Sequence, residues 1–337
     1  MTGPGKGVYF PKDPHRDNSA ALAAEPEAKE QMDRTSGDGS TAAIEAASWR
    51  DFYELCKPRV VMLMILTAII GMLLAVPGMV PLDILLLGNL GIALSAASAA
   101  VVNHLVDRHV DRKMARTLNR PLARGRVEPL HASLFALALG LSGMLLLVVF
   151  VNTLTAVLTL ASLLGYAVIY TLFLKRATPQ NIVIGGIAGA TPPLLGWTAV
   201  TGEIHGHALL LVLIIFAWTP PHFWALAIHR RDEYASAEIP MLPVTHGILY
   251  TKMHVLLYTI ILVLVSVLPY STGMLGPVYL AGALVLGAGF LYWSLAMFLG
   301  SRPTVCMDTF RYSIFYLMAL FVMMLLDHYL FPLGQQS

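Results

Sequence analysis

The sequence predicts an all-α protein, a polytopic membrane bundle of nine transmembrane helices. Its 337 residues are 57% hydrophobic and only 12% charged, with a mean hydropathy of +0.69. Nine apolar runs approach the ~20 residues that a helix needs to cross a bilayer. The Lys and Arg residues gather on one side of these runs. Such a composition and charge pattern exclude an ordinary soluble domain.

The nine apolar runs would cross the membrane in alternating directions. We expect the spans at residues 60–76, 82–102, 131–150, 154–174, 181–200, 207–229, 252–269, 277–299 and 311–330. Each of the 22 Lys and Arg residues lies in the N-terminal segment, in one of the alternate connections between spans, or at a span end next to such a connection. Because short loops rich in Lys and Arg stay in the cytoplasm, we expect a cytoplasmic N-terminus and a C-terminus outside.

The N-terminal segment differs in composition from the rest of the chain. Residues 1–49 are rich in Gly, Pro, Ala and Glu, show no helical periodicity, and contain eight acidic against five basic residues. This composition predicts a disordered tail, and its acids argue against a mitochondrial transit peptide. We therefore expect a bacterial inner-membrane protein with a tail that does no chemistry and one nine-helix domain over residues 50–330.

A series of polar residues, Asn103-xxx-Asp107-xxx-Asp111, ends the second apolar run. Its i, i+4, i+8 spacing places the three side chains on one face of a helix. Two carboxylates one turn apart repel each other, and a divalent cation would relieve that repulsion. Mg²⁺ is usually held by one or two carboxylates together with substrate phosphates. The series therefore predicts a Mg²⁺ or Mn²⁺ site for a lipid diphosphate; the alternative is a solvated loop.

Ionisable side chains are concentrated at the expected cytoplasmic face. They lie in the connections at residues 103–130 and 230–250, while the expected spans carry almost no charge. A transporter should instead present polar groups along a path near the bilayer midplane. The pattern favours a reaction on a membrane-dissolved substrate with a polar head group, and a cytoplasmic active site.

Several strings resemble a known family. The series from Asn103 to Asp111 resembles the first aspartate motif of the UbiA-type intramembrane prenyltransferases. Three further strings resemble the branch of protoheme IX farnesyltransferases, or heme O synthases: residues 166–193, Thr219-Pro220-Pro221-His222-Phe223-Trp224-Ala225-Leu226-Ala227, and Ile239-Pro240-Met241-Leu242-Pro243. The resemblance covers about residues 50–325. In the later loop, where many members carry a second Asp-xxx-Asp motif, Asp232 is followed four residues on by Ser236.

The resemblance implies that farnesyl diphosphate donates its farnesyl group to a vinyl side chain of heme B, and that water addition completes heme O. It implies catalysis and metal binding by Asn103, Asp107 and Asp111, where the metal would stabilise the leaving diphosphate. Heme B would be a substrate and not a resident cofactor. The implied partners are the bilayer, heme A synthase and terminal oxidase assembly factors, and no nucleic acid is expected.

Other charged or aromatic side chains are further site candidates. Candidates to hold the diphosphate through charge-assisted hydrogen bonds are Arg112, Arg116, Lys175 and Arg176. Candidates in the later cytoplasmic loop are Arg231, Asp232 and Glu233. Candidates to contact heme are His222, Tyr166 and Tyr170. Lys175 and Arg176 are equally well read as topology anchors. His222 lies within an expected span, where an ionisable group suggests function, but a hydrogen-bonded packing histidine is an equal alternative.

Two other functions remain open at this point. One is prenyl transfer to a different aromatic acceptor, such as 4-hydroxybenzoate; the strings at residues 219–227 and 239–243 argue against it. The other is a membrane transporter or heme-handling protein without catalysis, against which the one-sided placement of charge argues.

Overall fold

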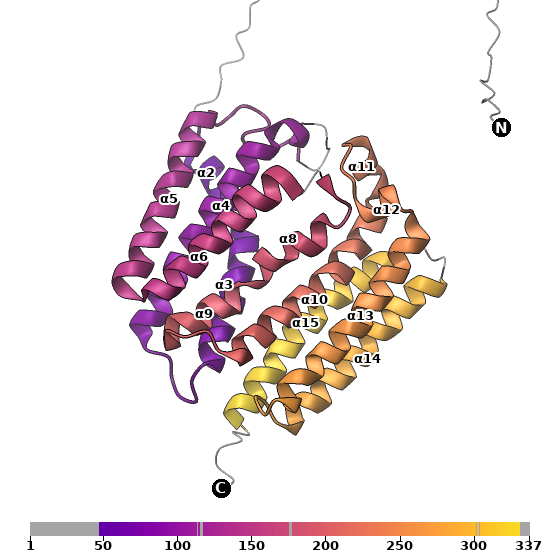
Figure 1. Ribbon diagram of the computed structural model, residues 1–337. Helices are drawn as coiled ribbons and strands as arrows, with labels where there is room; N and C mark the ends of the chain where they lie inside the picture. The colour runs from indigo at the N-terminus through magenta and orange to yellow at the C-terminus, as the bar shows by residue number, and fades with distance from the viewer. Residues whose placement is uncertain are drawn as a thin grey trace, which may run out of the picture. The chain divides into compact units, whose positions relative to one another are not determined.

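The computed structural model describes residues 47–112, 114, 117–174, 177–300, 302 and 304–330. Throughout this part of the chain every regular element is a helix (Figure 1), so the all-α prediction is confirmed. Among the described residues, eight helices are long and apolar enough to cross a membrane, or nine if one bent pair counts as a span. Most of the expected tail, residues 1–46, lies outside the described residues.

The helices follow the expected spans closely. They are α2 (Trp49–Leu55) with α3 (Pro58–Leu74), the π-helical η1 (Ile84–Gly88) with α4 (Asn89–Asp111), α5 (Pro129–Phe150), α6 (Thr153–Leu164) with the π-helical η2 (Gly165–Leu174), α8 (Asn181–Ala190) with α9 (Pro192–Thr201), α10 (Gly206–His229), α13 (Ile248–Ser271), α14 (Pro277–Leu299) and α15 (Val305–Leu330). Two short helices, α11 (Arg231–Ser236) and α12 (Leu242–Thr245), connect α10 to α13.

The first span is the bent pair, in which α2 and α3 meet at 51°. Ser48 and Asp51 form a capping box that begins α2, and Pro58 begins α3. A residue that precedes proline is disfavoured in the right-handed helical region, and Lys57 accordingly adopts a left-handed conformation with φ 50°. The local sequence therefore ends one helix and starts the next at Lys57.

Contacts between helices define two halves of the bundle. Helix α10 packs against α8, α13 and α15, whereas α3 packs against α9, α4 and α15, and α4 against α5. In Figure 1 the indigo-to-magenta helices α2–α9 lie on one side and the orange-to-yellow helices α13–α15 on the other. Met114, just after α4, packs with Tyr234 and Leu242 of α11 and α12. We call this end of the bundle the aspartate end.

Hydroxyl groups join helices inside the bundle, where the hydrophobic effect gives little net drive for association in lipid. The Thr155 hydroxyl donates to that of Thr198 at 2.9 Å, which joins α6 to α9. Ser266 of α13 and the hydroxyl of Tyr316 on α15 lie 2.7 Å apart. At the opposite end, the buried Asp327 accepts hydrogen bonds from backbone N–H groups at the start of α14, including one of 3.0 Å from Tyr279. These bonds fix the register of neighbouring spans.

Helices α3 and α9 approach backbone to backbone through two glycines. A Cβ atom added at Gly196 would overlap the carbonyl oxygen of Ala68, and one added at Gly71 would overlap that of Pro193. A larger residue at either position would force the two helices apart. This contact holds the first span against the centre of the bundle.

We predict that Gly196→Ala destabilises the protein by about 1–3 kcal/mol, the usual cost of overpacking a close contact. Gly189→Ala in the preceding helix is the matched control, because no described atom lies within 4 Å of its added Cβ. Both substitutions gain the same helix propensity, so the difference in stability between the two variants measures the cost of the clash at Gly196. Thermal unfolding in detergent measures it, and equal Tm values for the two variants would contradict the prediction.

Candidate active site

Asn103, Asp107 and Asp111 lie on one face of the last turns of α4, in agreement with their spacing. Their side chains are buried, with residue exposures of 4%, 2% and 5%. The Nδ2 group of Asn103 donates a 3.0 Å hydrogen bond to Oδ2 of Asp107. It also lies 3.4 Å from the hydroxyl of Thr171 on η2. The three residues form a single polar group inside the aspartate end of the bundle.

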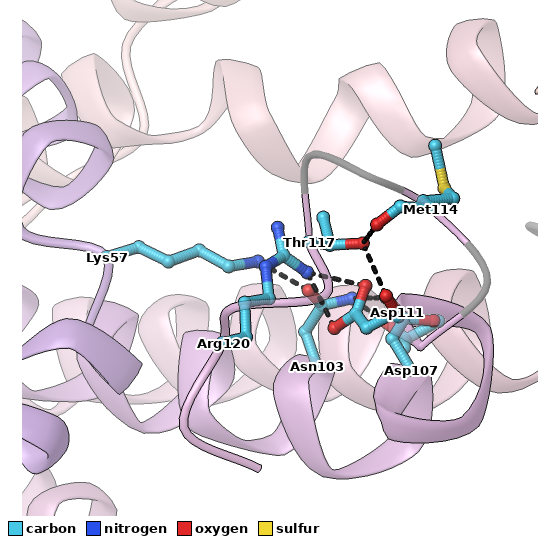
Figure 2. A network of polar contacts seen from close by, with 8 residues as sticks. Lys57, Asn103, Asp107, Asp111, Met114, Thr117 and Arg120 are labelled. Atoms are coloured by element: carbon cyan, nitrogen blue, oxygen red, sulfur yellow. Dashed lines mark hydrogen bonds and ion pairs between the residues drawn. The ribbon is translucent and has the colours of Figure 1, made fainter. Parts of the chain in front are cut away.

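Two cations from connecting segments meet this group (Figure 2). Nη1 of Arg120 donates to both carboxylate oxygens of Asp111, at 2.9 and 2.8 Å. Nζ of Lys57 donates to Oδ1 of Asn103. Because a buried charge is costly unless it is paired, Arg120 compensates the buried carboxylate of Asp111.

The segment that carries Arg120 is fixed by its own contacts. The Thr117 hydroxyl donates to the backbone carbonyl of Asp111 at 3.0 Å, which holds Thr117 against the end of α4. Farther along, Nη1 of Arg126 lies 2.8 Å from Oδ1 of Asp51 in α2. The connection between α4 and α5 is thereby tied to the helix that precedes Lys57, so both cations of the site share one supporting framework.

The chemistry of these side chains fits a divalent cation. Mg²⁺ prefers oxygen donors, and Asn103, Asp107 and Asp111 offer an amide oxygen and two carboxylates. In the described part of the chain, no three or more His, Cys, Asp or Glu side chains converge as a metal site. A metal here would therefore take its remaining ligands from phosphate oxygens and water. Such a metal would bind Asp111 together with Arg120 or in its place.

The structure places the other charged candidates at the same end but in different settings. Nε of Arg112 donates to the carbonyl of Ala123 at 2.9 Å. Asp232 is 98% exposed and pairs with its neighbour Arg231 at 3.9 Å, and Glu233 lies 4.0 Å from Arg230. The described contacts thus do not bring this later loop to the three residues of α4. Arg116, Lys175 and Arg176 lie outside the described residues.

The aromatic candidates come from η2 and α10. Tyr166 and Tyr170 stack on η2 with ring centroids 5.5 Å apart. The ring of His222 lies between those of Trp218 and Phe310, at centroid distances of 4.1 and 4.6 Å. Nδ1 of His222 lies 2.7 Å from the hydroxyl of a serine on α15. Packing and one hydrogen bond therefore account for the position of His222.

An apolar cavity of about 220 Å³ adjoins the polar group. Lys57 lines it and is also the residue that contacts Asn103. Tyr166 lines another wall, and the remainder is formed mainly by aliphatic side chains of α3, α4, α6, α9, α10 and α15. The arrangement can hold an anionic head group at the aspartate end and an apolar chain within the bundle.

Comparisons with known proteins agree with this geometry. A model of the UbiA prenyltransferase family matches residues 64–323. A protoheme IX farnesyltransferase of Saccharophagus degradans is 71% identical over 288 residues, which cover 86% of this chain and 95% of that protein. The chain belongs to the protoheme IX farnesyltransferases of the UbiA prenyltransferase family. A protoheme IX farnesyltransferase of Teredinibacter turnerae is 67% identical to this prenyltransferase, over 89% of its chain and 97% of the relative.

Solved structures show that the prenyltransferase has the fold of this family. The structure of a digeranylgeranylglyceryl phosphate synthase matches with a TM-score of 0.72 and 18% identity, over 83% of this chain and 98% of that one. A UbiA homolog from Archaeoglobus fulgidus bound to GPP and Mg²⁺ matches with a TM-score of 0.54 and 16% identity, over 81% and 99% of the two chains.

Lys57 and Arg120 are site residues that the sequence alone does not reveal. Lys57 directly precedes the first span and resembles a topology anchor. Arg120 is one of six Lys and Arg residues in the connection between α4 and α5. The only signal for Lys57 is the proline that follows it, which predicts a break in the helix at that position.

We predict that Arg120→Met destabilises the prenyltransferase, because Asp111 is left buried without its guanidinium partner. Breaking a buried pair costs up to roughly 3–5 kcal/mol, and the 22% exposure of the Arg120 side chain lowers that figure. Mg²⁺ should raise the Tm of the variant more than that of the wild type, since the metal can take the vacated carboxylate.

The control is Arg124→Met, in the same connection, where an exposed guanidinium contacts Asn119. Its Tm and its response to Mg²⁺ should match the wild type. An equal response to Mg²⁺ in Arg120→Met and the wild type would argue against a metal at Asp111.

Proposed function

We propose that this chain transfers the farnesyl group of farnesyl diphosphate to a vinyl side chain of heme B and that water addition then gives heme O. The observation that carries the proposal is the buried group of Asn103, Asp107 and Asp111, joined through Lys57 to an apolar cavity. The names of the relatives from Saccharophagus degradans and Teredinibacter turnerae support the choice of donor and acceptor.

The head group of the donor binds at the aspartate end. A divalent cation, Mg²⁺ or Mn²⁺, held by Asn103, Asp107 and Asp111 would neutralise charge on the leaving diphosphate. Lys57 and Arg120 lie beside these residues and donate charge-assisted hydrogen bonds to phosphate oxygens. In this proposal Arg112, Arg116, Lys175 and Arg176 supply further positive charge for the diphosphate.

The apolar cavity protects the reacting chain. Departure of diphosphate leaves an allylic cation, which water would quench, and the aliphatic walls exclude water. The electron-rich vinyl carbon of heme B then forms the new carbon–carbon bond, so no basic side chain is required for that step. Tyr166, which lines the cavity, Tyr170 and His222 are the proposed contacts of the porphyrin. In this proposal Arg231, Asp232 and Glu233 take part from the later loop.

The proposal includes the setting of the enzyme. Residues 50–330 form the catalytic domain in a bacterial inner membrane, and the tail takes no part in the chemistry. The aspartate end faces the cytoplasm, and the product passes to heme A synthase and terminal oxidase assembly factors. The positive residues of the described connections, such as Arg112, Arg120 and Arg231, support this orientation because they lie at the aspartate end.

We predict that Asp107→Asn and Asp111→Asn each lower heme O formation by at least about a hundredfold. This is the usual loss of rate when one group that stabilises the charge developing in the transition state is removed. Asp308→Asn is the control, because Asp308 lies at the start of α15 and pairs with Arg311 at 3.6 Å, away from the three residues. Heme extracted from a host that expresses each variant is resolved by mass, and immunoblots give the membrane level. Wild-type heme O in either variant would overturn the metal assignment.

We also predict the topology. Reporter fusions after Pro121, Arg176 and Arg231 should report the cytoplasm, and fusions after Pro77, Glu203 and the C-terminus should report the opposite side. The physical reason is the positive charge at the aspartate end. A cytoplasmic C-terminus would show that the number of spans is not nine.

A further inference from the structure

The apolar cavity has a depth that can be followed along two helices. On α3 its lining runs from Lys57 to Thr67, ten residues, which is roughly 15 Å at ~1.5 Å per residue. On α4 it ends at Ile92, eleven residues below Asn103, which is roughly 16 Å. The two helices therefore give the same distance from the polar group to the bottom of the cavity.

The bottom of the cavity is closed by packed side chains. Ile92 and Leu195 line the cavity and also belong to a buried apolar cluster with Ala68, with exposures of 1%, 3% and 0%. Beside this cluster, Gly71 and Gly196 bring the backbones of α3 and α9 into contact. A second buried cluster, which includes Met72 and Ala199, continues the packing toward the opposite end.

We propose that Ile92 and Leu195 form a floor that selects a C15 prenyl donor, an inference that rests on the proposed function. An extended chain advances by roughly 1.25 Å for each carbon–carbon bond of ~1.5 Å, so a farnesyl chain spans about 14 Å and a geranylgeranyl chain about 19 Å. The first matches the depth of the cavity. The second meets the floor, while a geranyl chain of about 9 Å leaves apolar lining uncovered.

The first test deepens the cavity. Ile92→Ala with Leu195→Ala removes three carbon atoms from each side chain, together more than the five of one isoprene unit. The variant and the wild type receive heme B with geranyl, farnesyl and geranylgeranyl diphosphates in competition, and the products are resolved by mass. We expect the ratio of geranylgeranyl to farnesyl transfer to rise about tenfold or more, in the range that one or a few methylene groups give in an apolar pocket.

A matched control separates specificity from general loosening. Ile214 and Leu211 of α10 are fully buried, at 0% exposure, and do not line the cavity. Ile214→Ala with Leu211→Ala therefore removes the same atoms from the core elsewhere. This variant should keep the wild-type preference for the farnesyl donor.

A second variant shortens the cavity and remains informative if the deepened protein fails to fold. Ala96 lines the cavity seven residues below Asn103, at a depth of roughly 10 Å, where a geranyl chain ends. Ala96→Leu should shift the preference about tenfold toward the geranyl donor. The substitutions at the floor and at Ala96 are therefore expected to shift the donor preference in opposite directions.

Binding without an acceptor separates this proposal from the proposed function. Non-hydrolysable thiodiphosphates of the three chain lengths are titrated against the wild type in the absence of heme. If the C15 analogue binds most tightly to the wild type and loses this advantage in the Ile92/Leu195 variant, the floor is supported. This conclusion holds even if no heme product forms, because the absence of product would reject heme as the acceptor and not the floor. Equal use of C15 and C20 donors by the wild type, or an unchanged C15 preference in the deepened variant, would overturn the proposal.

Discussion

Two carboxylates stacked one turn apart inside the end of a membrane bundle are the constraint on which the site depends. Asp107 and Asp111 are almost completely buried, and burying charge without partners costs several kcal/mol per ion. Arg120 relieves this cost at Asp111, and Lys57 donates to Asn103, which in turn donates to Asp107. The ion pair between Arg126 and Asp51 ties the segment that follows Arg120 to the helix that precedes Lys57.

The two halves of the bundle contribute differently to the site. The largest buried apolar cluster is formed mainly by α10, α13, α14 and α15, and hydroxyl bonds such as that between Ser266 and Tyr316 reinforce it. This half presents one wall of the cavity through Ile215, Trp218 and Leu317. The helices of the first half carry the polar group and the other walls. The C-terminal half thus acts as a rigid support against which the reactive groups are arranged.

The sequence predicts the spans well because each is a continuous apolar run that must satisfy its own backbone hydrogen bonds in lipid. It also predicts that Asn103, Asp107 and Asp111 share a face, since helical spacing is a local property. The positions of Lys57 and Arg120 are not predictable in the same way. Lys57 contacts Asn103, 46 residues farther along the chain, and Arg120 contacts Asp111 from an irregular segment, so neither pairing follows a periodic pattern. The closure of the cavity near Gly196 likewise depends on contact between separate helices.

The closed cavity also determines how a product can leave. A chain that cannot pass Ile92 and Leu195 returns through the mouth, where Val60 and Leu63 line the cavity and are also 54% and 43% exposed on α3. Carrying a fifteen-carbon chain into water would cost about 12 kcal/mol at ~0.8 kcal/mol per carbon, whereas lipid is as apolar as the cavity walls. A farnesylated product therefore partitions directly into the bilayer, where it can diffuse in two dimensions.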